Sequence, residues 1–275
     1  MTTIRIGHSP DPDDAFMFYA LTHGKVKAGE LRIEHVLEEI EALNRRAVTA
    51  EFEVTAISAA TYVLVADQYR IMDPGASMGL GYGPVLVARE SVPTAVIEDR
   101  VVAIPGSHTT AALLLRLYCG APPIIEVPFD KIPQAVLEGQ ADLGLLIHEG
   151  QITHAAMGLV KVLDLGEKWR AESSLPLPLG INVVRRDLGE GVARSLSHAL
   201  RESIAYAHSH VDEAIEYAMR YGRGIDKETC RRFVLMYVND YTVTLGETGR
   251  HALEHLYRQA FARKLIPQIP TIDPI

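Results

Sequence analysis

Residues 142–151 read DLGLLIHEGQ, an apolar run that stops on a histidine. Residues 143–147 have the length and composition of a buried strand in a parallel sheet. Ligands of open α/β sheets bind outside the carboxyl ends of the strands, so this strand would present His148 to a cleft. Histidine titrates near neutral pH and commonly moves protons there, which makes His148 the candidate catalytic base. The plainer alternative is a strand-end histidine that only bonds to a backbone carbonyl.

The composition is that of a globular protein with one large domain or two ordinary domains. Of the 275 residues, 48% are hydrophobic and 23% are charged, and the formal net charge is −8. Lysine and arginine are scattered rather than clustered, so no nucleic-acid-binding surface is expected. Neither a secretory signal nor an apolar run of about 18 residues is recognisable, so we expect a cytoplasmic protein without membrane contact. Cys119 and Cys230 form no metal-binding motif and are expected to be reduced thiols.

Strand-like and helical patterns alternate along most of the chain, which predicts an α/β fold. The predicted strands cover residues 3–7, 31–37, 53–58, 85–88, 101–104, 126–129, 142–147, 160–165 and 179–184. The first predicted helix begins near residue 15. The others cover residues 40–50, 111–117, 132–138, 192–211, 212–219, 227–238 and 249–265. Residues 166–169 are predicted to form a loop.

A strand, a polar loop and a helix follow one another near residues 9–15, 58–62 and 107–111. This repetition suggests two similar doubly wound α/β lobes that present strand ends and helix N-termini to a shared central cleft. The chain is expected to cross between the lobes near residues 84–92 and 178–185. One lobe would then combine residues 1–88 and 183–275, and residues 89–182 would form the inserted lobe. Two crossing strands would allow the lobes to close around a ligand.

Two of these polar loops also allow ordinary capping roles. Residues 9–14 contain three aspartates, of which Asp13 or Asp14 is predicted to cap the following helix. Ser58 ends a strand where a helix begins, and as a lone residue it would be interpreted as a cap. Neither a metal-binding set such as HExxH nor a GxGxxG or P-loop motif is present, so no metal and no cofactor are expected.

The third polar loop carries the clearest binding motif. A buried strand ends at Ile104, a Pro-Gly turn follows, and hydroxyl residues then lead into a helix. The unpaired N–H groups and the positive dipole end of such a helix form an anion site. The hydroxyls of Ser107, Thr109 and Thr110 would add donors for a bound carboxylate or phosphate. Capping without a bound anion explains this stretch equally well by itself.

Taken together, these motifs resemble those of the 1,4-dihydroxy-6-naphthoate synthases, enzymes of the futalosine pathway of menaquinone biosynthesis. The resemblance spans nearly the whole chain, and its most specific part is IHEGQ at residues 147–151. The other motifs are HSPDPDDAF (8–16), AISA (56–59), GLGYGP (79–84), IPG (104–106), TTA (109–111), LPLG (177–180) and MYVN (236–239).

The resemblance implies a type II periplasmic-binding-protein-like fold with two α/β lobes around a central cleft. It also implies a carbon–carbon lyase that converts cyclic dehypoxanthinylfutalosine to 1,4-dihydroxy-6-naphthoate, with His148 as the base and no cofactor. The residues implied to bind the substrate are Asn44, Ser58, Thr109 and Thr110. Opening a carbocycle beside a carbonyl requires a base and donors that hold developing oxyanions. The carboxylate of the substrate would suit the helix N-terminus after Gly106.

Two other functions fit parts of the pattern. Chorismate dehydratase belongs to the same pathway and fold and also takes a carboxylated substrate, but the IHEGQ segment is not expected there. A solute-binding protein of a transporter would explain the lobes and the anion site, but not a histidine aimed at the cleft. The expected partner is a small carboxylate, without nucleic acid or membrane, and the oligomeric state stays open. Glu149 is expected to be a surface charge, because adjacent side chains on an extended segment point apart.

Overall fold

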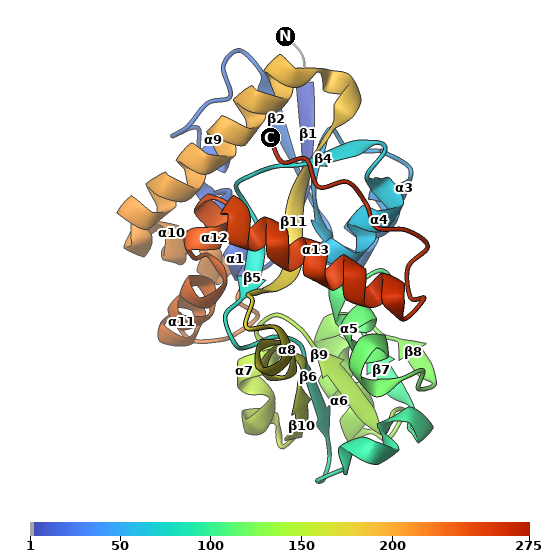
Figure 1. Cartoon of the computed structure of the whole chain (residues 1–275). Helices are drawn as coiled ribbons and strands as arrows, with labels where there is room; N and C mark the ends of the chain where they lie inside the picture. The colour runs from blue at the N-terminus through green and yellow to red at the C-terminus, as the bar shows by residue number, and fades with distance from the viewer. Residues whose placement is uncertain (1–2) are drawn as a thin grey trace.

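The computed structural model describes residues 3–275 and contains two α/β parts, one above the other in Figure 1. Each part is built on one mixed β-sheet. We call the part with the six-stranded sheet the first lobe and the part with the five-stranded sheet the second lobe. The two-lobed α/β architecture expected from the sequence is thus confirmed.

The sheet of the first lobe combines strands from two separate parts of the chain. Its strands are β1 (Thr3–His8), β2 (Arg32–Leu37), β3 (Val54–Ser58), β4 (Tyr69–Ile71), β5 (Ser77–Gly79) and β11 (Leu177–Arg185). Their order is β2-β1-β3-β11-β4, and β5 also pairs with β11. β1 runs parallel to β2 and β3, whereas β11 is antiparallel to its neighbours. The loops after β1 and β3 therefore leave the sheet at the same edge.

The sheet of the second lobe is built from one continuous part of the chain. Its strands are β6 (Val85–Ala88), β7 (Val102–Ile104), β8 (Ile124–Glu126), β9 (Leu143–Leu146) and β10 (Val160–Asp164). Their order is β10-β6-β9-β7-β8. β9 is buried along its whole length and is parallel to β7 but antiparallel to β6. Residues 143–146 of the apolar run therefore form the buried strand that the sequence predicts, whereas Ile147 lies beyond it and is half-buried.

Helices cover the sheets and form most of the last third of the chain. The α-helices are α1 (Pro12–Met17), α2 (Tyr19–Thr22), α3 (Ile40–Val48), α4 (Tyr62–Val65), α5 (Thr110–Cys119), α6 (Ile132–Leu137), α7 (Gly150–Thr153), α8 (Leu165–Ser173), α9 (Glu190–Ser209), α10 (Val211–Ala218), α11 (Lys227–Tyr237), α12 (Asp240–Val243) and α13 (Gly246–Ala262). The 3₁₀ turns cover Ala59–Thr61, Thr94–Asp99, Phe129–Lys131, His154–Met157, Arg186–Leu188 and Met219–Tyr221.

The helix α13 links the two lobes through a shared hydrophobic core. It packs against β11 of the first lobe and α5 of the second, and it runs across the middle of the molecule in Figure 1. Its Leu253, Leu256 and Tyr257 are fully buried in a core that includes residues of both sheets. The Tyr257 hydroxyl donates to the carbonyl of Ala59 at 2.8 Å, which satisfies a buried polar group. The lobes are therefore joined by packing as well as by the chain crossings.

The prediction of a loop over residues 166–169 is wrong, because these residues belong to α8. Asp164 starts this helix, since its carboxylate accepts hydrogen bonds from the N–H groups of Gly166 and Glu167 at 2.8 and 3.0 Å. Trp169 is 1% exposed, and its indole N–H donates to the carbonyl of Leu175 at 3.0 Å. A short polar stretch with a glycine lacks the apolar periodicity that would have revealed the helix.

Three smaller predictions also differ from the structure. The first helix begins at Pro12 with Asp11 as its cap, rather than near residue 15 with Asp13 or Asp14 in that role. The strand expected at residues 126–129 lies at Ile124–Glu126, and two short strands, β4 and β5, were not predicted. Proline at the first helical position fits the observed start, because its missing N–H is not needed there.

The expected division into residues 1–88 with 183–275 and residues 89–182 stays a prediction. By hydrogen bonding, however, β6 belongs to the five-stranded sheet and all of β11 belongs to the six-stranded sheet. Sheet membership therefore changes between residues 79 and 85 and between residues 164 and 177.

Two neighbouring histidines make the stability of the first lobe sensitive to acid: the buried His8 at the end of β1 and the half-buried His35 of β2. His8 is 2% exposed, stacks on Phe18 with 4.4 Å between ring centroids, and has its Nε2 3.1 Å from Nδ1 of His35. Burial, reinforced by the neighbouring His35, lowers the pKa of His8 to about 3, and burial lowers that of His35 to about 4. Both rings are therefore neutral in the folded protein at neutral pH.

We expect the free energy of unfolding to fall as pH decreases from about 6.5 towards 3, because the unfolded chain binds protons that the folded His8 excludes. A pKa difference of about 3.5 units for His8 corresponds to about 5 kcal/mol at most. His8→Phe keeps the stacking surface and should flatten the fall, measured by urea unfolding at pH 7, 6, 5 and 4. His198→Phe, at an exposed site, is the control. Equal pH slopes for wild type and His8→Phe would contradict the prediction.

Candidate active site

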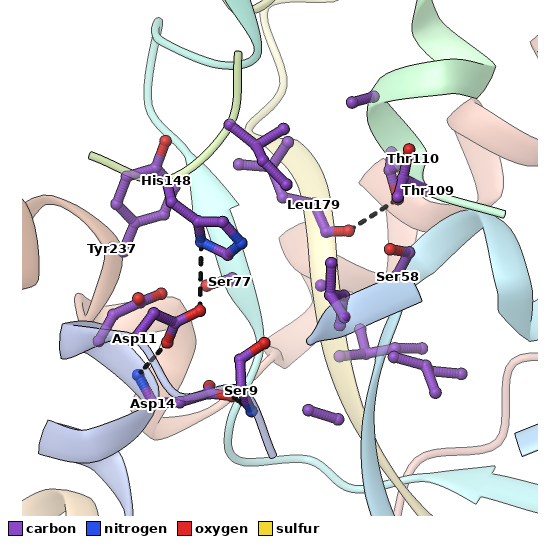
Figure 2. A pocket seen from close by; sticks show the side chains of 18 of the residues that line it. Ser9, Asp11, Asp14, Ser58, Ser77, Thr109, Thr110, His148, Leu179 and Tyr237 are labelled. Carbon is purple, nitrogen blue, oxygen red and sulfur yellow. Dashed lines mark hydrogen bonds and ion pairs between the residues drawn. The ribbon is translucent and has the colours of Figure 1, made fainter. Parts of the chain in front are cut away.

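A cavity lies between the two lobes, at the edge where the loops after β1 and β3 meet the end of β9. It holds about 720 Å³ of space when the open solvent at its mouth is included. Figure 2 shows His148 and Asp11 on one side of the cavity and Ser58, Thr109 and Thr110 on the other. The remaining polar residues that line it are Ser9, Asp13, Asp14, Ser77, Gln151, Asn182 and Tyr237.

His148 lies two residues after the end of β9 and reaches the cavity, as the sequence predicts. Its backbone adopts φ +52°, a left-handed conformation that is uncommon outside glycine and often marks a functional position. Its ring packs beside Phe129 with 4.7 Å between the centroids. Its Nε2 atom is buried and has no hydrogen-bond partner among residues 3–275. An imidazole nitrogen is therefore available to a ligand in the cavity.

Asp11 holds the other nitrogen of this ring. Its Oδ2 lies 3.2 Å from Nδ1 of His148, while its Oδ1 accepts from the N–H of Asp14 at 3.2 Å as the cap of α1. The cap fixes the carboxylate, so the ring is oriented by a rigid partner from the opposite lobe. A carboxylate at Nδ1 favours the tautomer with its proton there and leaves a lone pair on Nε2. Sequence reasoning missed this role, and the only hint was an aspartate-rich loop between a strand and a helix.

Asp13 and Asp14 are buried beside Asp11. Burial, followed by the charges of the other two aspartates, raises the pKa of Asp13 well above its usual value. Burial and the charge of Asp11 likewise raise the pKa of Asp14, although the N–H of Ser9 opposes the rise. The charged forms of these two carboxyl groups are therefore disfavoured at this end of the cavity.

The same end brings together a set of groups that could ligate a cation. Asp11, Asp13 and His148 each offer one ligand atom, and these atoms lie within 4.8 Å of one another. Carboxylate and imidazole ligands suit divalent ions such as Zn²⁺ or Mn²⁺. This cluster is not recognisable in the sequence, because His148 is distant in the chain from Asp11 and Asp13. Assays of the protein should therefore include a chelator.

Ser58 presents a hydroxyl group from the end of β3 on the opposite side. Its N–H donates to Oδ1 of Asn44 at 2.8 Å, and its Oγ accepts from Nδ2 of Asn44 at 3.1 Å. The amide thus occupies an acceptor site of the hydroxyl and leaves its proton free for a ligand. Asn44 is fully buried and does not line the cavity, so it positions Ser58 rather than reaching a ligand itself.

The N-terminus of α5 completes this side of the cavity. The Thr109 hydroxyl caps the helix, since it donates to the carbonyl of Gly106 at 2.8 Å and accepts from the N–H of Ala112 at 3.1 Å. The Thr110 hydroxyl donates to the carbonyl of Leu179 on β11 at 2.7 Å. Both hydroxyls are thus engaged with backbone. Because the N–H groups of Ala112 and Leu113 already donate to Thr109, those of Thr110 and Ala111 are the first-turn donors left for an anion.

Ser107 and His108 lie outside the cavity. Glu126 accepts from the N–H of Ser107 at 3.0 Å and also binds its hydroxyl. His108 pairs with Glu41, 2.7 Å from its Nδ1. The expectation that Ser107 contributes to the cleft is therefore not supported by its position, because a carboxylate outside the cavity already engages its donors.

Asn182 on β11 is a cavity residue to which the sequence analysis assigned no role. Its Nδ2 donates to the carbonyl of Gly75 at 2.9 Å, which fixes the amide orientation. Its Oδ1 is buried and has no partner within the described chain. A side chain at position 75 would collide with this amide, so Gly75, at φ +90°, is needed there. Asn182 is thus set up to accept a hydrogen bond from a ligand.

Gln151 and Tyr237 line the cavity next to His148. The Gln151 amide satisfies its neighbours when its nitrogen donates to the carbonyl of Gly83 at 2.6 Å. Its oxygen then accepts from the N–H of His148 at 3.2 Å and from the Tyr237 hydroxyl at 2.8 Å. Burial raises the pKa of Tyr237 well above its usual value, so the hydroxyl stays protonated.

The expectation that Glu149 is a surface charge is wrong. Its side chain is 11% exposed and pairs with Arg223, whose Nη1 lies 3.3 Å from its Oε1. The rule that adjacent side chains point apart requires an extended backbone. The left-handed turn at His148 breaks that condition and directs Glu149 inward.

Two α/β lobes with a ligand-sized cavity between them define the class of proteins with the periplasmic-binding-protein fold. The structure resembles the alkanesulfonate-binding protein SsuA from Xanthomonas axonopodis pv. citri, with a TM-score of 0.75 at 10% identity over 99% of this chain and 96% of that one. At this identity the likeness concerns the fold alone. None of the helices described between residues 3 and 275 is long and apolar enough to cross a membrane.

The chain belongs to the menaquinone biosynthesis family, whose sequence pattern matches residues 4–262. It is 42% identical to a 1,4-dihydroxy-6-naphthoate synthase of Thermus thermophilus, over 98% of both chains. It is 34% identical to an enzyme of the same name from Streptomyces coelicolor, over 97% of this chain and 96% of that one. A solved structure from Archaeoglobus fulgidus is 55% identical with a TM-score of 0.93, over 96% of this chain and 98% of that one.

Proposed function

We propose that this protein is a 1,4-dihydroxy-6-naphthoate synthase, a carbon–carbon lyase that acts on cyclic dehypoxanthinylfutalosine with His148 as the base. The observation that carries the base assignment is the Nε2 atom of His148, buried at the cavity without a partner in residues 3–275. Asp11, 3.2 Å from Nδ1, supports the tautomer that such a base needs. The names of two relatives that share nearly the whole chain support the reaction.

The two sides of the cavity suit the two ends of this substrate. The benzoate-type carboxylate would bind the N–H groups at the start of α5 and the free proton of Ser58. The part that reacts would then face His148, where Asn182 and the aspartates can bind its hydroxyl groups. His148 would remove the proton, and preorganised donors would hold the oxyanion that develops. Asn44, Thr109 and Thr110 hold these donors in place through the hydrogen bonds described above.

No organic cofactor is needed for this reaction. The proposed partner is a small carboxylate in the cytoplasm, without nucleic acid or membrane. Chorismate dehydratase activity is the second candidate, because the anion-binding side would also accept the carboxylates of chorismate. Reversible binding without turnover is the third, because the structure of SsuA shares the fold.

Purified protein should convert cyclic dehypoxanthinylfutalosine to 1,4-dihydroxy-6-naphthoate, measured by liquid chromatography and mass spectrometry. Parallel reactions contain chorismate, and all are run with and without a chelator. Naphthoate formed from the first substrate alone supports the proposal. Loss of turnover in chelator would assign the Asp11, Asp13 and His148 cluster to a metal instead of a free base. A ligand recovered unchanged would favour a binding protein.

Ser58→Ala is expected to raise KM about 10- to 100-fold with a smaller change in kcat, because a hydrogen bond to a charged group contributes about 1.5–3 kcal/mol. Steady-state kinetics with the naphthoate assay measure this change. Ser107→Ala is the matched control, since its hydroxyl binds Glu126 outside the cavity. If Ser107→Ala had the larger effect, the carboxylate would bind elsewhere.

A further inference from the structure

We propose that Arg223 is a positioning residue of the active site, which keeps Asp11 and His148 in contact by tying the two lobes together beside them. The expected effect of Arg223 on kcat rests on the proposed function, whereas the contacts of Arg223 do not. Arg223 lies in the loop between α10 and α11 of the first lobe. It does not line the cavity, so it acts through its neighbours.

The guanidinium of Arg223 holds the backbone segments next to both members of the pair. Its Nη2 donates to the carbonyl of Pro10 at 2.9 Å, and its Nη1 lies 3.3 Å from Oε1 of Glu149. Pro10 precedes Asp11 in the first lobe, and Glu149 follows His148 in the second. One planar side chain therefore fixes the spacing between two segments that no strand pairing connects.

A third contact supports the imidazole ring itself. The guanidinium carbon of Arg223 lies 4.5 Å from the ring centroid of Phe129 in the second lobe. The Phe129 ring in turn lies 4.7 Å from that of His148. The Phe129 ring therefore contacts both the guanidinium, through cation–π attraction, and the imidazole of the proposed base.

The charges around Arg223 explain why a cation is needed at this position. The Glu149 side chain is largely buried, and its Oε2 has no partner in the part of the chain that the structure describes. Glu39, at the start of α3 in the first lobe, lies close enough to Arg223 for the guanidinium charge to affect the pKa of Glu39. Burial and the charge of Asp130 raise that pKa, while Arg223 and His148 oppose the rise. Without Arg223, carboxylates of the two lobes would repel each other across the cleft.

Lysine cannot replace this side chain fully. A single ammonium can pair with Glu149, but it lacks the planar fork that reaches a carbonyl and a carboxylate while stacking on Phe129. Arg223→Lys should therefore keep part of the effect, and Arg223→Met should lose it. Arg220→Met removes an exposed charge from the same loop and is the matched control.

The first test needs no substrate. Proton–nitrogen NMR of the histidine side chains reports the Nδ1 proton of His148, which contact with Asp11 protects from exchange, and His148→Asn assigns the signal. We expect this signal to broaden or disappear in Arg223→Met, to weaken in Arg223→Lys and to persist in Arg220→Met. An unchanged signal in Arg223→Met would overturn the proposal, whichever reaction the protein catalyses.

The second test uses the naphthoate assay. Arg223→Met is expected to lower kcat about 10- to 100-fold with KM changed less than about threefold, because a small misplacement of a catalytic group has a large effect on rate. Added to His148→Asn, it should cause no further loss, since it acts through His148. Losses that multiply in the double variant would mean that Arg223 acts independently and would refute the positioning role. A wild type without turnover would remove the proposed function and leave the NMR result decisive.

Discussion

Replacing His148 with asparagine is expected to lower kcat by about 10²–10⁴-fold, the usual contribution of a general base. The substitution removes Nε2, the nitrogen that faces the cavity. Asparagine is the informative replacement, because it tolerates the left-handed backbone at φ +52° and can still donate a hydrogen bond towards Asp11. The measurements are steady-state naphthoate formation and calorimetric binding of the substrate, which should be retained.

His154→Asn is the matched control, since this histidine lies in the same segment but does not line the cavity. Its kcat should stay within about twofold of wild type. If His148→Asn kept most of the activity while both variants folded normally, the base would be another group of the cavity. The buried aspartates beside it would be tested next.

Asp11→Asn is expected to lower kcat by a similar factor, on the order of 10²–10⁴, although it changes only one atom. The N–H of Asp14 binds Oδ1 of Asp11, so the oxygen of the new amide will keep that position. Its NH₂ group will then face Nδ1 of His148 and favour the tautomer with its proton on Nε2. That tautomer cannot accept a proton at the cavity. Asparagine also caps helices well, so α1 should remain folded.

Asp226→Asn provides the matched control for Asp11→Asn. Asp226 caps α11 by accepting from the N–H of Thr229 at 2.9 Å, and it has no catalytic neighbour. We expect normal activity and a small change in thermal stability. Full activity of Asp11→Asn, measured in the same assay, would show that His148 does not need its carboxylate partner.

Local sequence patterns were sufficient to place several parts of the site. The apolar run before His148 has the length and composition of a buried strand, and the end of that strand places the imidazole at the cavity. The Pro-Gly turn and hydroxyl residues before α5 likewise predicted a helix N-terminus, which Thr109 caps. In both cases the information lies within a dozen residues, where hydrophobic periodicity and capping rules apply.

Contacts between the lobes could not be predicted in this way. Nothing in the polar loop at Asp11 indicates which residue of a distant segment will approach it. The pairing of Glu149 with Arg223 depends on the left-handed backbone conformation of His148, which is uncommon for a residue other than glycine and was not predicted. Ser107 illustrates the opposite case. It was a plausible donor for a ligand, but its N–H and hydroxyl bind Glu126 of the neighbouring strand instead.

The position of β11 also has a consequence for how the chain acquires its fold. This strand lies between β3 and β4, yet it is made only after every strand of the second lobe. Until then, one edge of β3 is unpaired and open to incorrect pairing. The second lobe, whose strands all lie within residues 85–164, can assemble during that interval. During synthesis on the ribosome, the second lobe should therefore fold before the first lobe. The sheet of the first lobe should be completed last, when β11 pairs with β3 and β4.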